Sequence, residues 1–129
     1  GSPAACAVAL KNLEIMEKEN LIKRSRVLGE KLNNELKDLL EHPNVGDIRS
    51  RGLLLGIELV EDKDSKQPLK SEKVDQVIAF CKNAGLIIGK NGYTVEGYNN
   101  ILTLSPPLSI TDEDLEFIID TVKTAIKKV

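Results

Sequence analysis

RSRGLLLGIELV, residues 49–60, is the stretch on which the fold of this chain depends. Side chains alternate between the two faces of an extended chain. One face of this stretch is therefore wholly apolar and consists of Leu53, Leu55, Ile57 and Leu59. The pattern predicts a central strand with helices packed on that face, and the apolar run 53–55 suggests that both faces are covered near its start. Gly52 and Gly56 should let another backbone or side chain come close.

Length and composition restrict the class of protein. The 129 residues are 41% apolar and 29% charged, with a net charge of −2, which is typical of one soluble globular domain. We expect neither a nucleic-acid nor a membrane partner, because basic residues are spread along the chain and no apolar run could cross a bilayer. Cys6 and Cys81 lie in apolar helical patterns without metal-ligand spacing, and no secretory signal is visible. They are expected to be buried free thiols of a cytoplasmic protein.

The first 20 residues form an unusual beginning. Pro3 suits the first position of a helix and Ser2 suits its cap, so a helix is predicted from Pro3 to Glu19. This helix is small or apolar on nearly every side, and such helices are normally buried all round. We expect it to pack on a missing part of the protein or on a second subunit. The chain resembles a piece cut from something longer, and Gly1-Ser2 could be a cloning scar.

The remaining elements alternate in type along the chain. Helices are predicted at 21–40, at 71–84 with a Ser71 cap and a left-handed stop at Gly85, and from Thr111 onward, where TDED resembles a capping box. Strands are predicted at 45–51, 53–60, 86–88 and 101–104, and a long loop with both tyrosines at 90–100. The order predicts an α+β domain over residues 1–129: two layers, with a small, mostly antiparallel sheet and helices on one face.

The residues alone do not indicate a catalytic site. His42 is the only histidine and stands at a helix end without an evident partner, which favours a structural role. The sequence GKNG at 89–92 lacks the spacing of a phosphate-binding loop, and no metal-ligand cluster is present. The acidic run 112–114 is explained by its position at a helix start. Residue-level reasoning therefore reaches a soluble α+β domain and no further.

Four segments in order resemble one enzyme family. They are the start Gly1-x-Pro3 with AACAVAL, then VGDIRSRGLLLGIEL (45–59), GLIIGKNG (85–92) and NILTLSPPLSITDEDL (100–115). Together they resemble the C-terminal, small domain of a class III aminotransferase of fold type I, which uses pyridoxal 5′-phosphate (PLP). The loop from GKNG to GYNNI further resembles the branch that acts on ω-amino acids or taurine with pyruvate.

This resemblance implies where the chemistry lies. In the family, the Schiff-base lysine, the aspartate facing the pyridine nitrogen and most phosphate ligands precede the segment that matches Gly1. The resemblance therefore assigns no catalytic, cofactor-binding or metal-binding side chain to this chain, which alone should be inert. It implies PLP in the parent enzyme, a homodimer, the missing large domain as partner, and an amine and a 2-oxo acid as substrates. Gly1, Ser2 and Pro3 are carried over only as backbone near the cofactor site.

The same resemblance identifies one substrate-binding candidate. Many family members carry an arginine three residues before the Pro-Pro pair, where it holds a substrate α-carboxylate. Here that position is Thr103. Threonine cannot replace a bidentate guanidinium–carboxylate contact, so substrates whose acid group is absent, distant or held elsewhere are favoured. Thr103 could also be an ordinary strand residue. Arg49, Arg51 and Glu58 also match motif positions and are interpreted as structural, in an ion pair or a domain contact.

Two other readings remain open on the sequence. The chain could be a non-catalytic α+β binding or regulatory module, which should cover its first helix within its own 129 residues. A piece of a larger enzyme should leave that helix exposed or bury it against another copy. The parent could also be another PLP enzyme of the same fold type, such as an aminomutase or a decarboxylase.

Overall fold

The structure is a computed structural model, and it describes residues 1–92 and 95–129. Its helices are α1 (Pro3–Lys18), α2 (Leu21–Leu36), the 3₁₀ helix η1 (Lys37–Glu41), α3 (Ser71–Asn83) and α4 (Asp112–Ile126). Its strands are β1 (Val45–Arg51), β2 (Leu54–Leu59), β3 (Gly89–Lys90) and β4 (Ile101–Leu104). This order confirms the predicted α+β class. Of the two tyrosines expected in the loop 90–100, Tyr93 lies outside the described residues.

The four strands form one antiparallel sheet in the order β1-β2-β4-β3. Strand β2 has a neighbour on each side and is therefore the central strand that residues 49–60 predict. Its inward side chains are almost fully buried: Leu55 is 4% exposed, and Ile57 and Leu59 are 0% exposed. The hairpin from β1 to β2 turns at Gly52, whose φ of +55° falls in the left-handed region that favours glycine.

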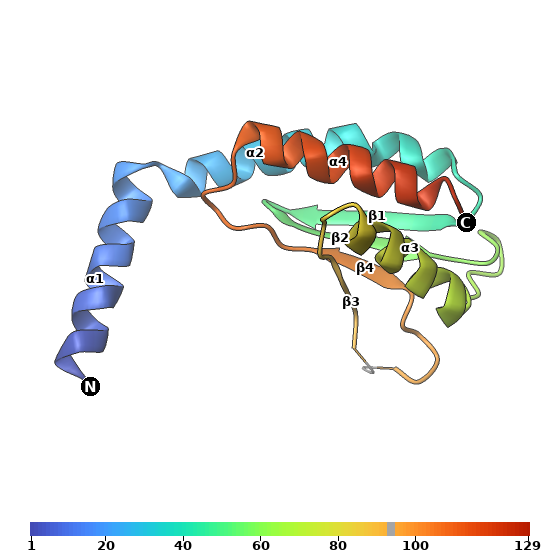
Figure 1. Ribbon diagram of the computed structural model, residues 1–129, viewed down its shortest axis with the longest axis horizontal. Helices are drawn as coiled ribbons and strands as arrows, with labels where there is room; N and C mark the ends of the chain where they lie inside the picture. The colour runs from blue at the N-terminus through green and yellow to red at the C-terminus, as the bar shows by residue number, and fades with distance from the viewer. Residues whose placement is uncertain (93–94) are drawn as a thin grey trace.

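The helices α2, α3 and α4 provide the second layer. Figure 1 shows α2 and α4 side by side along one face of the sheet. Buried side chains from all three helices join the inward residues of β2 and β4 in one apolar core. The fully buried members include Leu32 of α2, Val74 of α3 and Leu115 of α4, which lie on the apolar stripes expected from helical spacing.

One close approach locks the first packed helix onto the sheet. A Cβ atom built on Gly29 of α2 would stand 2.1 Å from the carbonyl oxygen of Gly52 and 2.7 Å from its Cα. No side chain can occupy that space, so helix and hairpin touch backbone to backbone. The sequence predicts that another part of the chain comes close to Gly52. In the structure this part is the backbone of α2 at Gly29.

Three local predictions are wrong. The stretch 86–88 is not a strand: pairing with β4 begins only at Gly89, and Ile87 is 88% exposed. The sheet is not covered on both faces near its start, because Leu54 is 63% exposed. Ser71 does not cap α3, because Lys70 stands at the N-cap position and no side chain accepts a hydrogen bond there. Local composition shows neither the register at which pairing begins, nor whether another element covers a strand face, nor the exact residue at which a helix starts.

Helix α1 projects away from the other elements, with the N-terminus at its far end (Figure 1). None of its residues is buried, and Val8 and Leu10 are 70% and 64% exposed. Cys6 is exposed for the same reason, so the prediction of a buried thiol is wrong for Cys6 and confirmed for Cys81. Within this chain α1 therefore has almost no surface to pack on.

A search of the described residues for a helix long and apolar enough to span a membrane finds none.

Candidate functional site

The face of the sheet opposite the helices, here called the open face, carries the substrate-binding candidate Thr103. Arg49 pairs with Gly56, and Gly56 pairs with Thr103. Because directly paired residues share a face of the sheet, these three positions lie on the same face. A shallow groove of about 460 Å³ runs over this face. Its lining includes Arg49, Arg51, Leu54, Gly56, Thr103 and Ser105. The structure therefore brings Thr103 and the two motif arginines onto one surface.

Thr103 stands in this groove between two glycines. It pairs with Gly56 of β2 on one side and with Gly89 of β3 on the other. Since neither glycine has a side chain, Thr103 is the only side chain in this row across three neighbouring strands. It is exposed, so its hydroxyl and methyl groups are accessible from the open face.

Arg49 is held in place by two carboxylates. Its Nη1 lies 2.7 Å from Oδ2 of Asp47 and 2.9 Å from Oε2 of Glu58. The hydrogen bonds that it donates to Glu58 and to Asp47 raise the pKa of Arg49. Arg49 is 54% exposed at its side chain, so each ion pair contributes about 0–1 kcal/mol to stability. This geometry agrees with the structural role, in an ion pair or a domain contact, that the sequence suggests for Arg49 and Glu58. Arg51 has no ion pair with any described residue.

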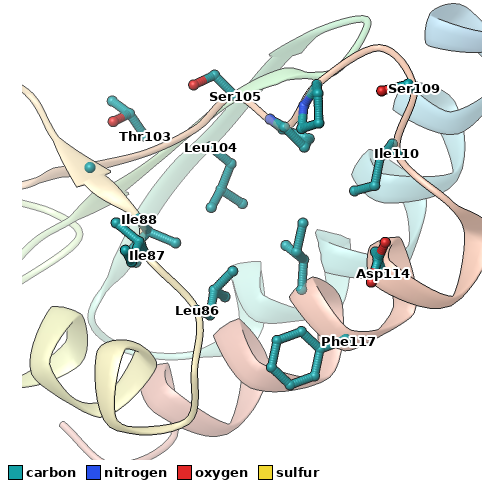
Figure 2. A pocket seen from close by; sticks show the side chains of 14 residues that line it. Leu86, Ile87, Ile88, Thr103, Leu104, Ser105, Ser109, Ile110, Asp114 and Phe117 are labelled. Atoms are coloured by element: carbon teal, nitrogen blue, oxygen red, sulfur yellow. The ribbon is translucent and has the colours of Figure 1, made fainter.

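A second groove, of about 580 Å³, lies at the β3 edge of the sheet and shares Thr103, Leu104 and Ser105 with the first. Figure 2 shows Leu104 and Ile110 pointing into the space between the sheet and α4, whereas Thr103 and Ser105 point away from it. The lining of this second groove is mainly apolar and includes Leu86, Ile88, Pro106 and Phe117. This groove exists because residues 86–88 leave the sheet instead of pairing with β4.

The lysines of this chain are exposed or half-buried. PLP chemistry needs a lysine that bonds the cofactor and a carboxylate that keeps its ring an electron sink. None of the lysines is buried, and Lys31, Lys90 and Lys123 are engaged with surface carboxylates. In the described part of the chain, no group of three or more His, Cys, Asp or Glu side chains could hold a metal ion.

Other sequence-marked residues lie apart from the open face. Gly1, Ser2 and Pro3 are exposed at the far end of α1, so this chain does not bring them near Thr103. His42 ends η1, and its Nδ1 accepts a hydrogen bond from the backbone N–H of Asn44 at 3.2 Å. Burial, with a smaller effect of Lys63, lowers the pKa of His42. These contacts give His42 a structural role.

Sequence reasoning misses Gly89. A Cβ atom on Gly89 would stand 2.5 Å from Oγ1 of Thr103, so the two positions depend on each other. Gly89 lies in GLIIGKNG, but its pairing with Thr103 depends on a register that the sequence does not show, because the predicted strand ends one residue earlier. Finding Gly89 from the sequence would require a signal that links positions 89 and 103, which lie on different strands.

The family model for aminotransferase class III matches residues 1–126. An uncharacterized aminotransferase, YhxA, of Bacillus subtilis (strain 168) is 62% identical over 129 residues, which are 100% of this chain and 29% of that protein. A taurine–pyruvate aminotransferase of Bilophila wadsworthia is 37% identical over 130 residues, covering 100% of this chain and 28% of that protein. The chain therefore spans less than a third of the length of these relatives.

Solved structures agree with this assignment. An aminotransferase of Bacillus anthracis superposes with a TM-score of 0.95 at 57% identity, over 99% of this chain and 29% of that chain. An (S)-enantioselective ω-transaminase from Thermomicrobium roseum superposes with a TM-score of 0.86 at 34% identity, over 99% of this chain and 28% of that chain. By sequence and by fold, this chain belongs to the class III aminotransferase family.

Proposed function

We propose that this chain is the C-terminal, small domain of a PLP-dependent transaminase that moves an amino group from an ω-amino acid or amine to a 2-oxo acid such as pyruvate. The family match supports the reaction class. The relatives described as a taurine–pyruvate aminotransferase and an ω-transaminase support the substrate class. A cytoplasmic location and a homodimeric parent enzyme belong to the same proposal.

The observation that carries the proposal is the combination of a family match over residues 1–126 with an uncovered α1. Val8, Leu10 and Leu13 are 70%, 64% and 56% exposed. Leaving a row of large apolar side chains in water forgoes about 1.5–3 kcal/mol for each residue that could be buried. We propose that residues 1–20 pack on the large domain of the same protein or on a partner subunit. A free-standing binding module would have no reason to keep this helix uncovered.

The proposed division of labour follows from the chemistry of the side chains. PLP supplies the electron sink for transamination when it is bound by the large domain. This chain contributes no lysine or carboxylate to that task and is proposed to be inert alone. Its contribution is the open face, where Thr103 is proposed to contact the substrate, while Gly1, Ser2 and Pro3 provide backbone near the cofactor site.

Thr103 sets the proposed preference among donors. Its hydroxyl can donate one hydrogen bond to a carboxylate, whereas the guanidinium of an arginine there would donate two in parallel. In the full-length enzyme, Thr103→Arg should shift donor preference from ω-amino acids toward α-amino acids. Thr103→Lys is the control, because lysine has the positive charge but lacks the two parallel N–H donors of the guanidinium. An unchanged ratio of kcat/KM for β-alanine and L-glutamate would contradict this role.

The experiment that tests the function uses the full-length protein that contains this sequence. It is incubated with PLP, pyruvate and taurine, β-alanine or an arylalkylamine, and alanine formation is measured. We expect alanine in proportion to donor consumed. Loss of CO₂ from the donor, or migration of the amino group within it, would instead assign the parent to the decarboxylases or aminomutases.

A further inference from the structure

The contact between Gly89 and Thr103 has a consequence for the proposed site. The 2.5 Å separation between a built Gly89 Cβ and the Thr103 Oγ1 is shorter than a carbon–oxygen van der Waals contact, which is about 3.3 Å or more. A Cβ on the opposite glycine, Gly56, would instead meet Ile101 and would not come within 4 Å of Thr103. The hydroxyl of Thr103 therefore leans toward β3, into the space above Gly89.

The backbone does not explain this glycine. Gly89 is not among the glycines with positive φ, which are Gly52, Gly85 and Gly97. An L-residue could therefore adopt the same backbone conformation at position 89. The nearest atoms that a methyl group would meet are those of Thr103, so a side chain at 89 would have to displace the Thr103 hydroxyl.

The cations closest to Thr103 in the strand register are already paired. Arg49, which stands across Gly56 in the same row, is bound to Asp47 and Glu58. Lys90, the neighbour of Gly89, lies 2.5 Å from Oδ1 of Asp75 on α3. Within the row that joins Arg49, Gly56, Thr103 and Gly89, the hydroxyl is therefore the polar group that is left for a ligand. Arg51, which lines the same groove and has no ion pair with a described residue, lies outside this row.

We propose that Gly89 is a positioning residue for amino-donor specificity: because it lacks a side chain, the Thr103 hydroxyl keeps the orientation in which it meets the donor. This inference rests on the proposed function of the open face. A methyl group at 89 would rotate the hydroxyl away or move β3 from β4. The effect acts only through Thr103, which gives it a distinctive signature in a double-mutant cycle.

The test uses four variants of the full-length enzyme with PLP: wild type, Gly89→Ala, Thr103→Ala and the double variant. Donor kinetics are measured with β-alanine and pyruvate. Gly89→Ala should lower kcat/KM about tenfold, mainly through KM, which is the scale of one methyl group in a binding pocket. In the Thr103→Ala background the same substitution should change kcat/KM less than about twofold. Gly92→Ala, whose new methyl group meets no atom of the described residues within 4 Å, is the matched control and should change nothing.

Thermal unfolding of the same variants keeps the test informative if Gly89→Ala folds poorly. Thr103→Ala should then restore the melting temperature, because it removes the atom that the new methyl group meets. Equal losses of kcat/KM in both backgrounds, or no loss of kcat/KM in Gly89→Ala, would overturn the inference. Absence of transamination with every donor would overturn the proposed function instead, while the unfolding cycle would still report on the Gly89–Thr103 contact.

Discussion

The sharpest prediction concerns Gly29, where α2 meets the β1–β2 hairpin. In Gly29→Ala the new Cβ would stand 2.1 Å from the Gly52 carbonyl oxygen and 2.7 Å from its Cα. Because both atoms belong to the backbone, neither can rotate away, and α2 must withdraw by about 1 Å to reach an ordinary contact distance. That movement would loosen Leu28 and Leu32, which are 4% and 0% exposed.

The magnitude is the difference between two opposing effects. Overpacking of this kind costs about 1–3 kcal/mol, and the rigid backbone places this site at or above the upper end. Alanine is better than glycine inside a helix by about 1 kcal/mol. The net expectation is a loss of about 2 kcal/mol in the free energy of unfolding. Helix propensity alone predicts a gain.

Urea unfolding followed by circular dichroism measures this difference. With a slope of about 2 kcal/mol per molar urea, the midpoint should fall by about 1 M without a change in slope. Gly92→Ala, with no atom of the described residues within 4 Å of its built Cβ, is the control and should stay within about 0.5 kcal/mol of wild type. A midpoint that rises in Gly29→Ala would refute the backbone contact between α2 and Gly52.

Other predictions concern single side chains. Thr111→Ala should lower stability by about 1 kcal/mol, because Thr111 Oγ1 accepts the hydrogen bond of the Asp114 N–H at 3.1 Å; Thr111→Ser should keep most of it, and equal losses in both variants would contradict the cap. Burial lowers the pKa of His42, so the unfolded state binds more protons: the stability that this group contributes should be complete above its ordinary pKa of about 6.5 and decline as pH falls through the unfolded pKa toward the folded one. His42→Asn should flatten that decline in unfolding midpoints measured from about pH 7 to 5, and an unaltered slope would assign it to other groups. In the 129-residue chain a thiol reagent should modify exposed Cys6 quickly and Cys81, whose pKa burial raises, only on unfolding; in the full-length protein Cys6 should become protected, and equal labelling of Cys6 in both would contradict the packing of α1.

The sequence predicts most of this fold because its strongest patterns are periodic. The alternation of 53–59 identifies the inward face of β2, and Leu115 with its helical neighbours identifies that of α4. Both patterns reflect burial against a large apolar surface. They identify the buried face of β2 and of α4 even when the exact neighbours of each residue are not known. The order of helices and strands is therefore predicted correctly, and so is the left-handed stop at Gly85, which has a φ of +93°.

The errors arise where long-range geometry outweighs local pattern. Leu86-Ile87-Ile88 has the composition of a strand. Hydrogen-bonded pairing with β4 begins only at Gly89, however, and Ile87 is exposed to solvent. Leu54 continues an apolar run, but no described residue covers it. Cys6 lies on an apolar helix and is nevertheless exposed, because these 129 residues provide no surface to cover that helix.

The candidate site is only partly accessible from the sequence. Thr103 comes from a resemblance to a family, and the ion pair of Arg49 with Glu58 is anticipated from their shared motif. The row Gly56–Thr103–Gly89 is not, because it joins three strands whose register depends on the folded sheet. Sequence patterns specify which face a residue occupies more readily than which residue stands beside it.

The most direct test of the central claim is a PLP titration of two proteins side by side: this 129-residue chain and the full-length protein that contains it. The absorbance of lysine-bound PLP and the formation of alanine from pyruvate are followed together. We expect stoichiometric binding and amino transfer by the full-length protein, and neither by the short chain. Stoichiometric PLP binding with turnover of an amine by the 129-residue chain alone would contradict the claim.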